Sequence, residues 1–131
     1  MPISMYQASA PRFANMLRNL ATLIEKADAH CAAKKIDPAA ITSFRLYPDM
    51  FPFTRQVQIA CDTAKGAVAR LAGVEMPKHE DTEQSFAELS SVSHTALAWT
   101  AKGDLALERG DDRAAGELFR RAAEALQENH F

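Results

Sequence analysis

The chain has 131 residues, of which 47% are hydrophobic and 24% are charged. This composition allows one folded domain with one sizeable core and argues against disorder. The 15 basic and 17 acidic residues are spread along the chain and leave a net charge of −2. Because they form no basic stripe, we expect no nucleic-acid partner.

The sequence also lacks signals for export or membrane insertion. No apolar run approaches the roughly 20 residues that a membrane-spanning helix needs. The N-terminus lacks the basic and apolar regions of a signal peptide. Cys31 and Cys61 fall on the apolar sides of predicted helices, where we expect buried free thiols rather than a disulfide framework. These features predict a cytoplasmic protein with no membrane partner.

Apolar residues spaced three and four positions apart predict a first helix from about Ser4 to Lys34. The residues predicted to face inward are Phe13, Met16, Leu17, Leu20, Leu23, Ile24, Ala27 and Cys31. A connection follows from Ile36 to Pro52, in which Pro48 and Pro52 prevent a continuous helix.

A second helix is predicted to begin after Pro52 and to end at Gly73, a residue type common at helix C-termini. The buried stripe is predicted to consist of Phe53, Val57, Ala60, Cys61, Ala64, Val68 and Leu71. The opposite side of the helix is predicted to carry Arg55, Gln58, Asp62 and Lys65.

A third helix is predicted from near Thr82 to about Arg109, with Asp81 or Thr82 as its N-cap. A turn at Gly110, Asp111 and Asp112 then leads into a fourth helix. The residues of this helix predicted to face inward are Ala115, Leu118, Phe119, Ala122 and Leu126. No strand pattern occurs, so the predicted fold is an all-α four-helix bundle with up-down topology.

Patterns typical of catalytic or metal sites are missing from the sequence. No HxxxH or HExxH pair is formed by the four histidines, which are His30, His79, His94 and His130. Cys61 is followed by Asp62, but neighbours on a helix diverge by about 100° and do not face each other. We therefore expect no catalytic residue, no metal and no cofactor.

The aromatic stretch from Phe44 to Phe53 either packs down over the bundle or exposes an apolar patch. We expect it to pack as a lid on the core. The functional alternative makes it the wall of a small pocket for an unknown ligand. The residues of that wall would be Arg45, Tyr47, Asp49 and Phe51.

Three segments resemble a branch of unknown function in the DinB-like superfamily; they read MPISMYQAS, RLYPDMFPFTRQVQIACDTAKGAVARLAGVE and HEDTEQSFAELS. The resemblance covers residues 1–90. It implies a four-helix bundle, often dimeric, and in many relatives a divalent metal held by three histidines. The chain departs from that ligand pattern, because its second helix offers Gln56, Gln58 and Asp62 in place of histidine and its last helix has no histidine pair. No metal ligand is carried over.

Residues 96–129 resemble a single tetratricopeptide hairpin. The residues that match the landmarks of the repeat are Trp99, Gly103, Gly110, Ala115, Phe119 and Ala122. A lone repeat cannot bury its apolar face, so the hairpin must pack on the first two helices or on a second copy of the chain. A join inside one helix suggests a chimeric or designed protein, folded as one domain over residues 1–131.

Three functions remain open at this point. The chain is interpreted as a non-catalytic helical scaffold without native activity. The alternatives are a diverged DinB-like metal-dependent enzyme of unknown substrate and a helical module that binds a peptide or protein. A hairpin that docks on the first two helices could cover both apolar surfaces within a monomer, but a homodimer is slightly favoured, because bundles that the chain resembles often pair and 47% of its residues are hydrophobic.

Overall fold

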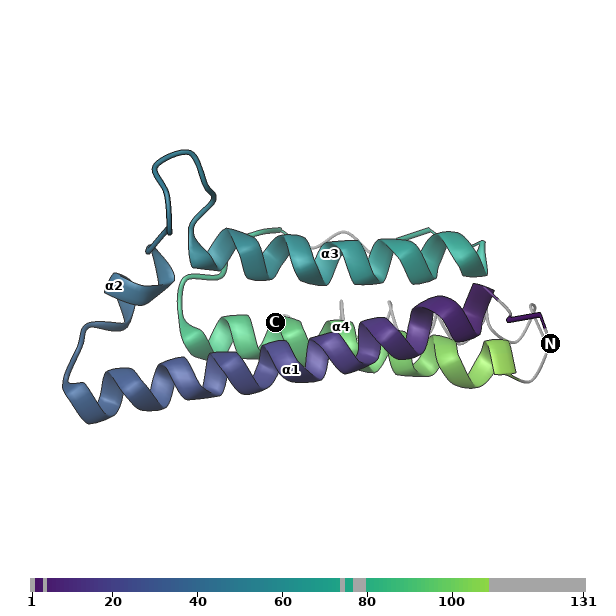
Figure 1. Cartoon of the computed structure of the whole chain (residues 1–131), viewed down its shortest axis with the longest axis horizontal. Helices are drawn as coiled ribbons and strands as arrows, with labels where there is room; N and C mark the ends of the chain where they lie inside the picture. Colours follow the sequence, from purple (N-terminus) through teal and green to yellow (C-terminus); the bar gives the residue numbers. More distant parts are fainter. Residues whose placement is uncertain (1, 4, 74, 77–79, 109–131) are drawn as a thin grey trace.

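The computed structural model describes residues 2–3, 5–73, 75–76 and 80–108. In this part of the chain the helices are α1 (Met5–Lys34), α2 (Pro38–Thr42), α3 (Phe53–Ala72) and α4 (Phe86–Glu108) (Figure 1). The predicted all-α class is confirmed for the described residues. The predicted fourth helix, with Ala115, Phe119 and their neighbours, lies outside them. None of the described helices combines the length and the hydropathy that crossing a bilayer requires.

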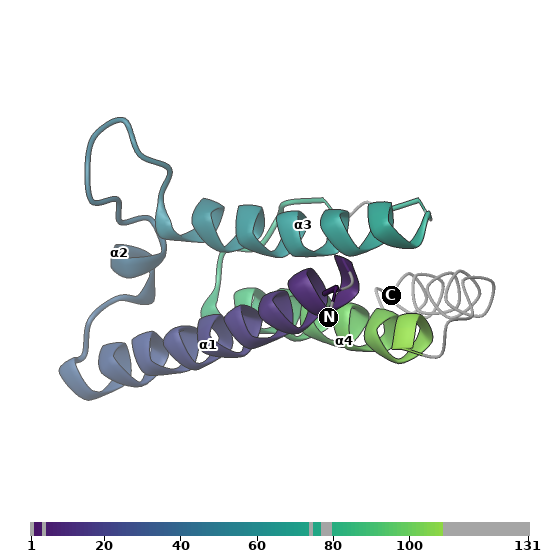
Figure 2. The ribbon, with the colours of Figure 1, turned by 45° about the vertical axis from the view of Figure 1, so that its right-hand side comes forward.

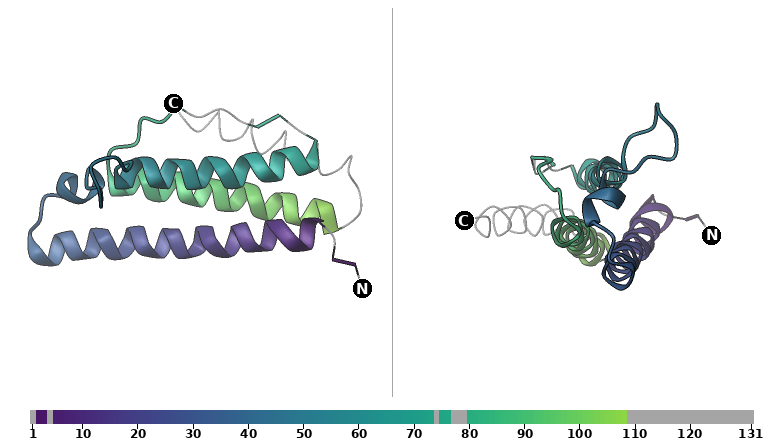
Figure 3. Two further views of the ribbon diagram at one scale, coloured as in Figure 1. Left: turned by 45° about the horizontal axis from the view of Figure 1, so that its top comes forward. Right: turned by 90° about the vertical axis from the view of Figure 1, so that its left-hand side faces the viewer.

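The three long helices lie side by side, and α4 packs against both α1 and α3 (Figures 1 and 3). The contact between α1 and α4 is the most extensive, and the contact between α1 and α3 is the sparsest of the three. The small residues Ala10, Ala14 and Ala21 are buried along α1 together with Leu17 and Ile24. Small side chains of this kind let a neighbouring helix approach closely.

The topology differs from the predicted up-down alternation, because α3 and α4 run parallel (Figure 1). The segment between them returns along the bundle to the start of α3. There the Arg55 guanidinium forms an ion pair with Asp81, and Gln58 Nε2 donates to Glu83 Oε2 at 2.8 Å. The rings of Phe53 and Phe86, at the two helix starts, meet edge to face with centroids 6.4 Å apart. A connection of this length can cross back, whereas a short turn would have forced antiparallel helices.

Two residues of α1 that were predicted to face inward are exposed in the structure. Met16 is 65% exposed and Leu23 is 57% exposed, although both were predicted to face inward. The buried residues follow a narrower line at Leu17, Ile24 and Cys31. Met16 and Leu23 lie beside this line, on the side of α1 that faces α3, where the two helices are only loosely packed.

Helix α3 begins and ends where it was predicted to, but the side predicted to face solvent is partly buried. Gly73 caps the helix in the left-handed conformation, with φ of 66°, and its amide donates to Arg70 O at 3.2 Å. Gln58 and Lys65 are buried rather than solvent-facing, and the returning segment with Glu83 covers that side at Gln58. Leu71, predicted to be buried, is 40% exposed near the helix end.

Helix α4 begins later than predicted, at Phe86, because a capping box forms there and not at Asp81 or Thr82. The Glu88 amide donates to Ser85 Oγ at 3.2 Å, and Glu88 Oε2 accepts from the Ser85 amide at 2.9 Å. The same carboxylate oxygen accepts from the Gln84 amide at 2.7 Å. The connection before α3 also differs from prediction, since it contains the single-turn helix α2, capped by Asp37.

Trp99 is the largest fully buried side chain, with 1% of its surface exposed. Its burial was predicted, but the predicted partners Ala115 and Phe119 lie outside the described residues. We expect Trp99→Ala to lower the free energy of unfolding by about 3–5 kcal/mol, because it removes the largest side chain from the core. Urea denaturation measures the loss, with Glu25→Ala at an exposed position of α1 as control. A loss below about 1 kcal/mol would contradict the burial of Trp99.

The capping box predicts a pH dependence. Hydrogen bonds from the Gln84 and Ser85 amides lower the pKa of the Glu88 carboxyl below its ordinary value of 4.5. The unfolded state therefore takes up the proton first as the pH falls, so the cap stabilises the fold above about pH 4.5 and this contribution is lost in more acidic solution. We expect the stability difference between the parent and Glu88→Gln to shrink from pH 7 to pH 3. Glu25→Gln, on the exposed side of α1, is the control, and a difference that stays constant with pH would contradict the cap.

Candidate binding groove

The four residues proposed as a pocket wall lie on an exposed loop between α2 and α3 (Figures 1 and 2). They are Arg45, Tyr47, Asp49 and Phe51, and all four are classed as exposed. The expectation that this loop packs down as a lid is wrong. Its ends are tied together by a hydrogen bond from the Phe53 amide to Phe44 O at 2.9 Å, so the loop turns away from the bundle.

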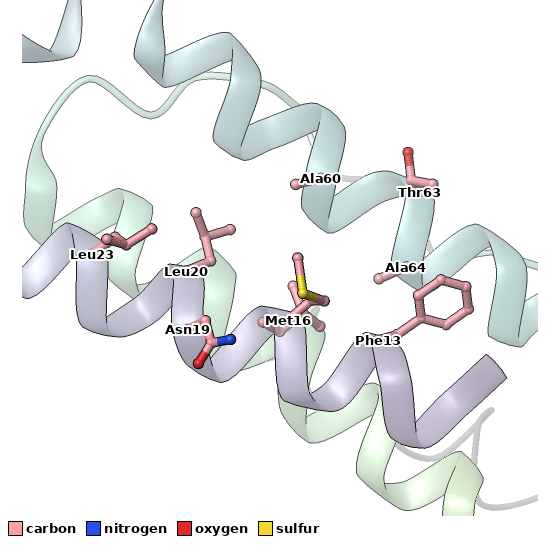
Figure 4. A pocket seen from close by; sticks show the side chains of 9 residues that line it. Phe13, Met16, Asn19, Leu20, Leu23, Ala60, Thr63 and Ala64 are labelled. Carbon is pink, nitrogen blue, oxygen red and sulfur yellow. The ribbon is translucent and has the colours of Figure 1, made fainter. Parts of the chain in front are cut away.

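An apolar cavity of the described part of the chain lies between α1 and α3. Nine residues line it, which are Phe13, Met16, Leu17, Asn19, Leu20, Leu23, Ala60, Thr63 and Ala64. Figure 4 shows the labelled apolar side chains of α1 on the side toward α3, the helix that carries Ala60 and Ala64, whereas Asn19 points away from it. We call this cavity, of about 340 Å³, the α1/α3 groove. None of the pocket-wall residues belongs to it.

The groove has an apolar lining. Asn19 and Thr63 are its polar residues, and no ionisable side chain lines it. The sequence contains one sign of the groove, which is the width of the apolar side of α1. The apolar side of α1 includes Met16, Leu20 and Leu23 in addition to the buried line, which is wider than packing against one helix requires.

Cys61 is the most deeply buried thiol, and its surroundings make it unreactive. Its Sγ lies 3.9 Å from Ser93 Oγ, between α3 and α4 and outside the groove lining. Burial raises the pKa of the Cys61 thiol above its ordinary value of 9.0, and the Ser93 contact and the Lys65 charge offset only part of this effect. Both cysteines are free and buried, as the sequence predicted.

Lys65 is an ionisable side chain within the core, with 2% of its surface exposed. Its Nζ lies 3.3 Å from Asp62 Oδ1, and that carboxylate is 41% exposed. The pair therefore joins a buried cation to an anion that water still reaches. A buried ammonium needs such a partner, because removing a charge from water costs several kcal/mol.

Metal-ligating residues do not converge in the described part of the chain, where no group of three His, Cys, Asp or Glu side chains could hold an ion. His94, on α4, is exposed and its Nδ1 donates to Ser90 O at 2.8 Å. His79 and His130 lie outside the described residues.

Comparison with known families shows the family of the chain. A domain of unknown function, DUF1993, matches residues 5–123. The chain belongs to the DUF1993 family. The matched range includes residues on both sides of residues 91–95, so one family model covers most of both parts of the sequence. Neither the tetratricopeptide resemblance nor a chimeric or designed origin finds support in these comparisons.

A solved structure agrees with the DinB-like resemblance of this DUF1993 chain. The crystal structure of a DinB family member from Shewanella denitrificans is 41% identical, with a TM-score of 0.70. The alignment covers 74% of this chain and 56% of that protein, so this chain matches little more than half the length of its relative. No curated protein matches the chain. The shared fold is a DinB-like helical bundle, and neither match assigns an activity.

The ion pair between the buried Lys65 and the partly exposed Asp62 predicts that mutations of the two residues have different effects on stability. Asp62→Asn leaves the ammonium of Lys65 without its counter-ion, and we expect it to lower the free energy of unfolding by about 1–2 kcal/mol. Lys65→Met removes the buried charge but keeps the length of the side chain, and we expect it to be neutral or stabilising. In the double variant the loss caused by Asp62→Asn should disappear. Equal losses in both single variants, measured by urea denaturation, would contradict a buried charge at Lys65.

Proposed function

We propose that this DUF1993 chain is a non-catalytic helical module that binds an apolar group of a partner in the α1/α3 groove. The observation that carries the proposal is the chemistry of the groove lining, which offers apolar contact and no ionisable side chain. Its volume of about 340 Å³ is in the range of small binding sites.

The position of the titratable residues supports a binding role over catalysis. General acid–base chemistry requires an ionisable group within hydrogen-bond reach of the reacting atoms. Cys61 and Lys65 are buried, and neither lines the groove. A ligand held in the groove would therefore meet methyl, methylene and aromatic groups rather than a described acid or base.

The exposure of the groove side chains supplies a driving force for binding. Met16 and Leu23 leave more than half of their surfaces in water. Covering both would contribute roughly 2–3 kcal/mol, because full burial of one such side chain is worth about 1.5–3 kcal/mol. The flexible thioether of Met16 can adapt to partners of different shape.

The test uses Nile red, an uncharged dye whose fluorescence rises in apolar surroundings. We expect the parent protein to bind the dye and Leu23→Glu to weaken binding at least fivefold, because a carboxylate at the groove disfavours apolar contact. Thr22→Glu is the matched control, since it adds the same charge one residue away at an exposed position outside the groove. Circular dichroism verifies that both variants are folded. Dye binding that is unchanged by Leu23→Glu, or weakened equally by Thr22→Glu, would overturn the proposal.

A further inference from the structure

The two helices that form the α1/α3 groove are basic, whereas the chain as a whole is acidic. Helices α1 and α3 together carry seven basic and three acidic residues, which gives them a net charge of +4. The remaining eight basic and fourteen acidic residues of the chain have a net charge of −6. An apolar groove between two basic helices favours a ligand that is both apolar and negatively charged.

Two of these cations lie along the rim of the groove. Asn19 of α1 lines the groove but points away from α3, and Arg12 and Lys26 lie seven residues before and after it (Figure 4). Seven residues make about two helical turns, so these three residues share one line along α1. Arg12 directly precedes Phe13, at one end of the lining, and is exposed. Lys26 is also exposed and lies about one turn beyond Leu23, at the other end.

The three acidic residues of α1 and α3 do not line the groove. Asp62 forms an ion pair with the buried Lys65. Asp28 lines a separate cavity at the C-terminal end of α1. Glu25 lies three residues after Thr22, on the side of α1 that is exposed and outside the groove. A negatively charged group at the rim is therefore close to cations of α1 rather than to the acidic residues of the two helices.

The dimensions of the groove suit one alkyl chain. Its lining on α1 runs from Phe13 to Leu23, a distance of about 15 Å along the helix axis. On the facing side, α3 contributes the small residues Ala60 and Ala64 (Figure 4). Nine residues line the groove, whereas a specific interface between two proteins has about 20–30 residues a side. The groove is therefore long enough for a flexible chain and too small for a protein surface.

We propose that the α1/α3 groove binds a single-chain carboxylate of the fatty-acid class. The alkyl chain lies along the apolar lining, and the carboxylate lies at the rim beside Arg12 or Lys26. This rests on the proposed function, because it identifies the apolar group in the groove as the chain of a small anionic molecule. Exposed ion pairs are weak, so burial of the chain supplies most of the affinity and the rim cations select the charge of the ligand.

Displacement of Nile red by two ions with the same alkyl chain tests the charge preference. We expect octanoate to displace the dye at roughly fivefold lower concentration than octyltrimethylammonium, because the rim cations attract the first and repel the second. In about 1 M salt, where the screening length falls to about 3 Å, the preference should shrink below twofold. Decanoate should bind at least fivefold more tightly than octanoate, because it buries two more methylene groups. All ligands are used below their micelle-forming concentrations.

Charge-removing variants of α1 test the rim. We expect the double variant Arg12→Gln/Lys26→Gln to weaken octanoate binding at least threefold and to change Nile red binding less than twofold, because the dye carries no charge. Arg18→Gln is the matched control, since Arg18 is exposed and lies one turn before Thr22, outside the groove. It removes the same charge from the same helix and should leave octanoate binding unchanged. The single variants Arg12→Gln and Lys26→Gln identify the end that holds the carboxylate.

The dye and the ions separate failure of the fatty-acid site from failure of the groove. Nile red binding that responds to Leu23→Glu, but is displaced equally by both ions or by neither, overturns the carboxylate site and leaves the proposed function intact. A preference for octanoate that survives the double variant, or that Arg18→Gln removes equally, also overturns the carboxylate site. A parent protein that binds no Nile red overturns the proposed function and this inference together.

Discussion

Close packing between α1 and α4 determines where the rest of the bundle lies. Helices α1 and α4 form the most extensive contact, and α1 buries the small residues Ala10, Ala14 and Ala21, a residue type that permits close approach of helices. Helix α3 packs mainly on α4 and meets α1 only sparsely. The α1/α3 groove is the consequence, because the apolar residues of α1 that α4 does not cover have no helix close enough to bury them.

The return segment between α3 and α4 is the second constraint. Contacts from Arg55 to Asp81 and from Gln58 to Glu83 fix the segment at the start of α3, and the capping box of Ser85 and Glu88 begins α4 there. These bonds set the parallel direction of the two helices. The same contacts explain why one side of α3 is buried despite its polar sequence. Gln58 is buried there because Glu83 of the return segment accepts its hydrogen bond.

Local sequence patterns predicted the positions of the helices well. They predicted less well which apolar residues are buried and in which direction the helices run. Periodicity located α1 and α3, and the residue types at Pro52 and Gly73 gave the ends of α3. Periodicity alone cannot say which of two adjacent apolar lines faces a partner, so Met16 and Leu23 were assigned to the core although they line the groove. Helix direction depends on how a long connection runs, and the sequence contains no local signal for that path. The exposed aromatic loop was missed because composition favours burial, whereas the hydrogen bond from Phe53 to Phe44 turns the loop outward.

The long sequence separation between α1 and its main partner α4 has a consequence for synthesis on the ribosome. The main partner of α1 is the last described helix, so about 70 residues must follow Lys34 before α4 is complete. At typical translation rates this takes roughly 4–15 s. During that interval the buried line of α1, from Ala10 to Cys31, has no partner, and α3 cannot replace α4 because its own contact with α1 is sparse. The nascent chain therefore exposes an amphipathic helix for seconds, which makes it a natural substrate for chaperones that bind apolar segments.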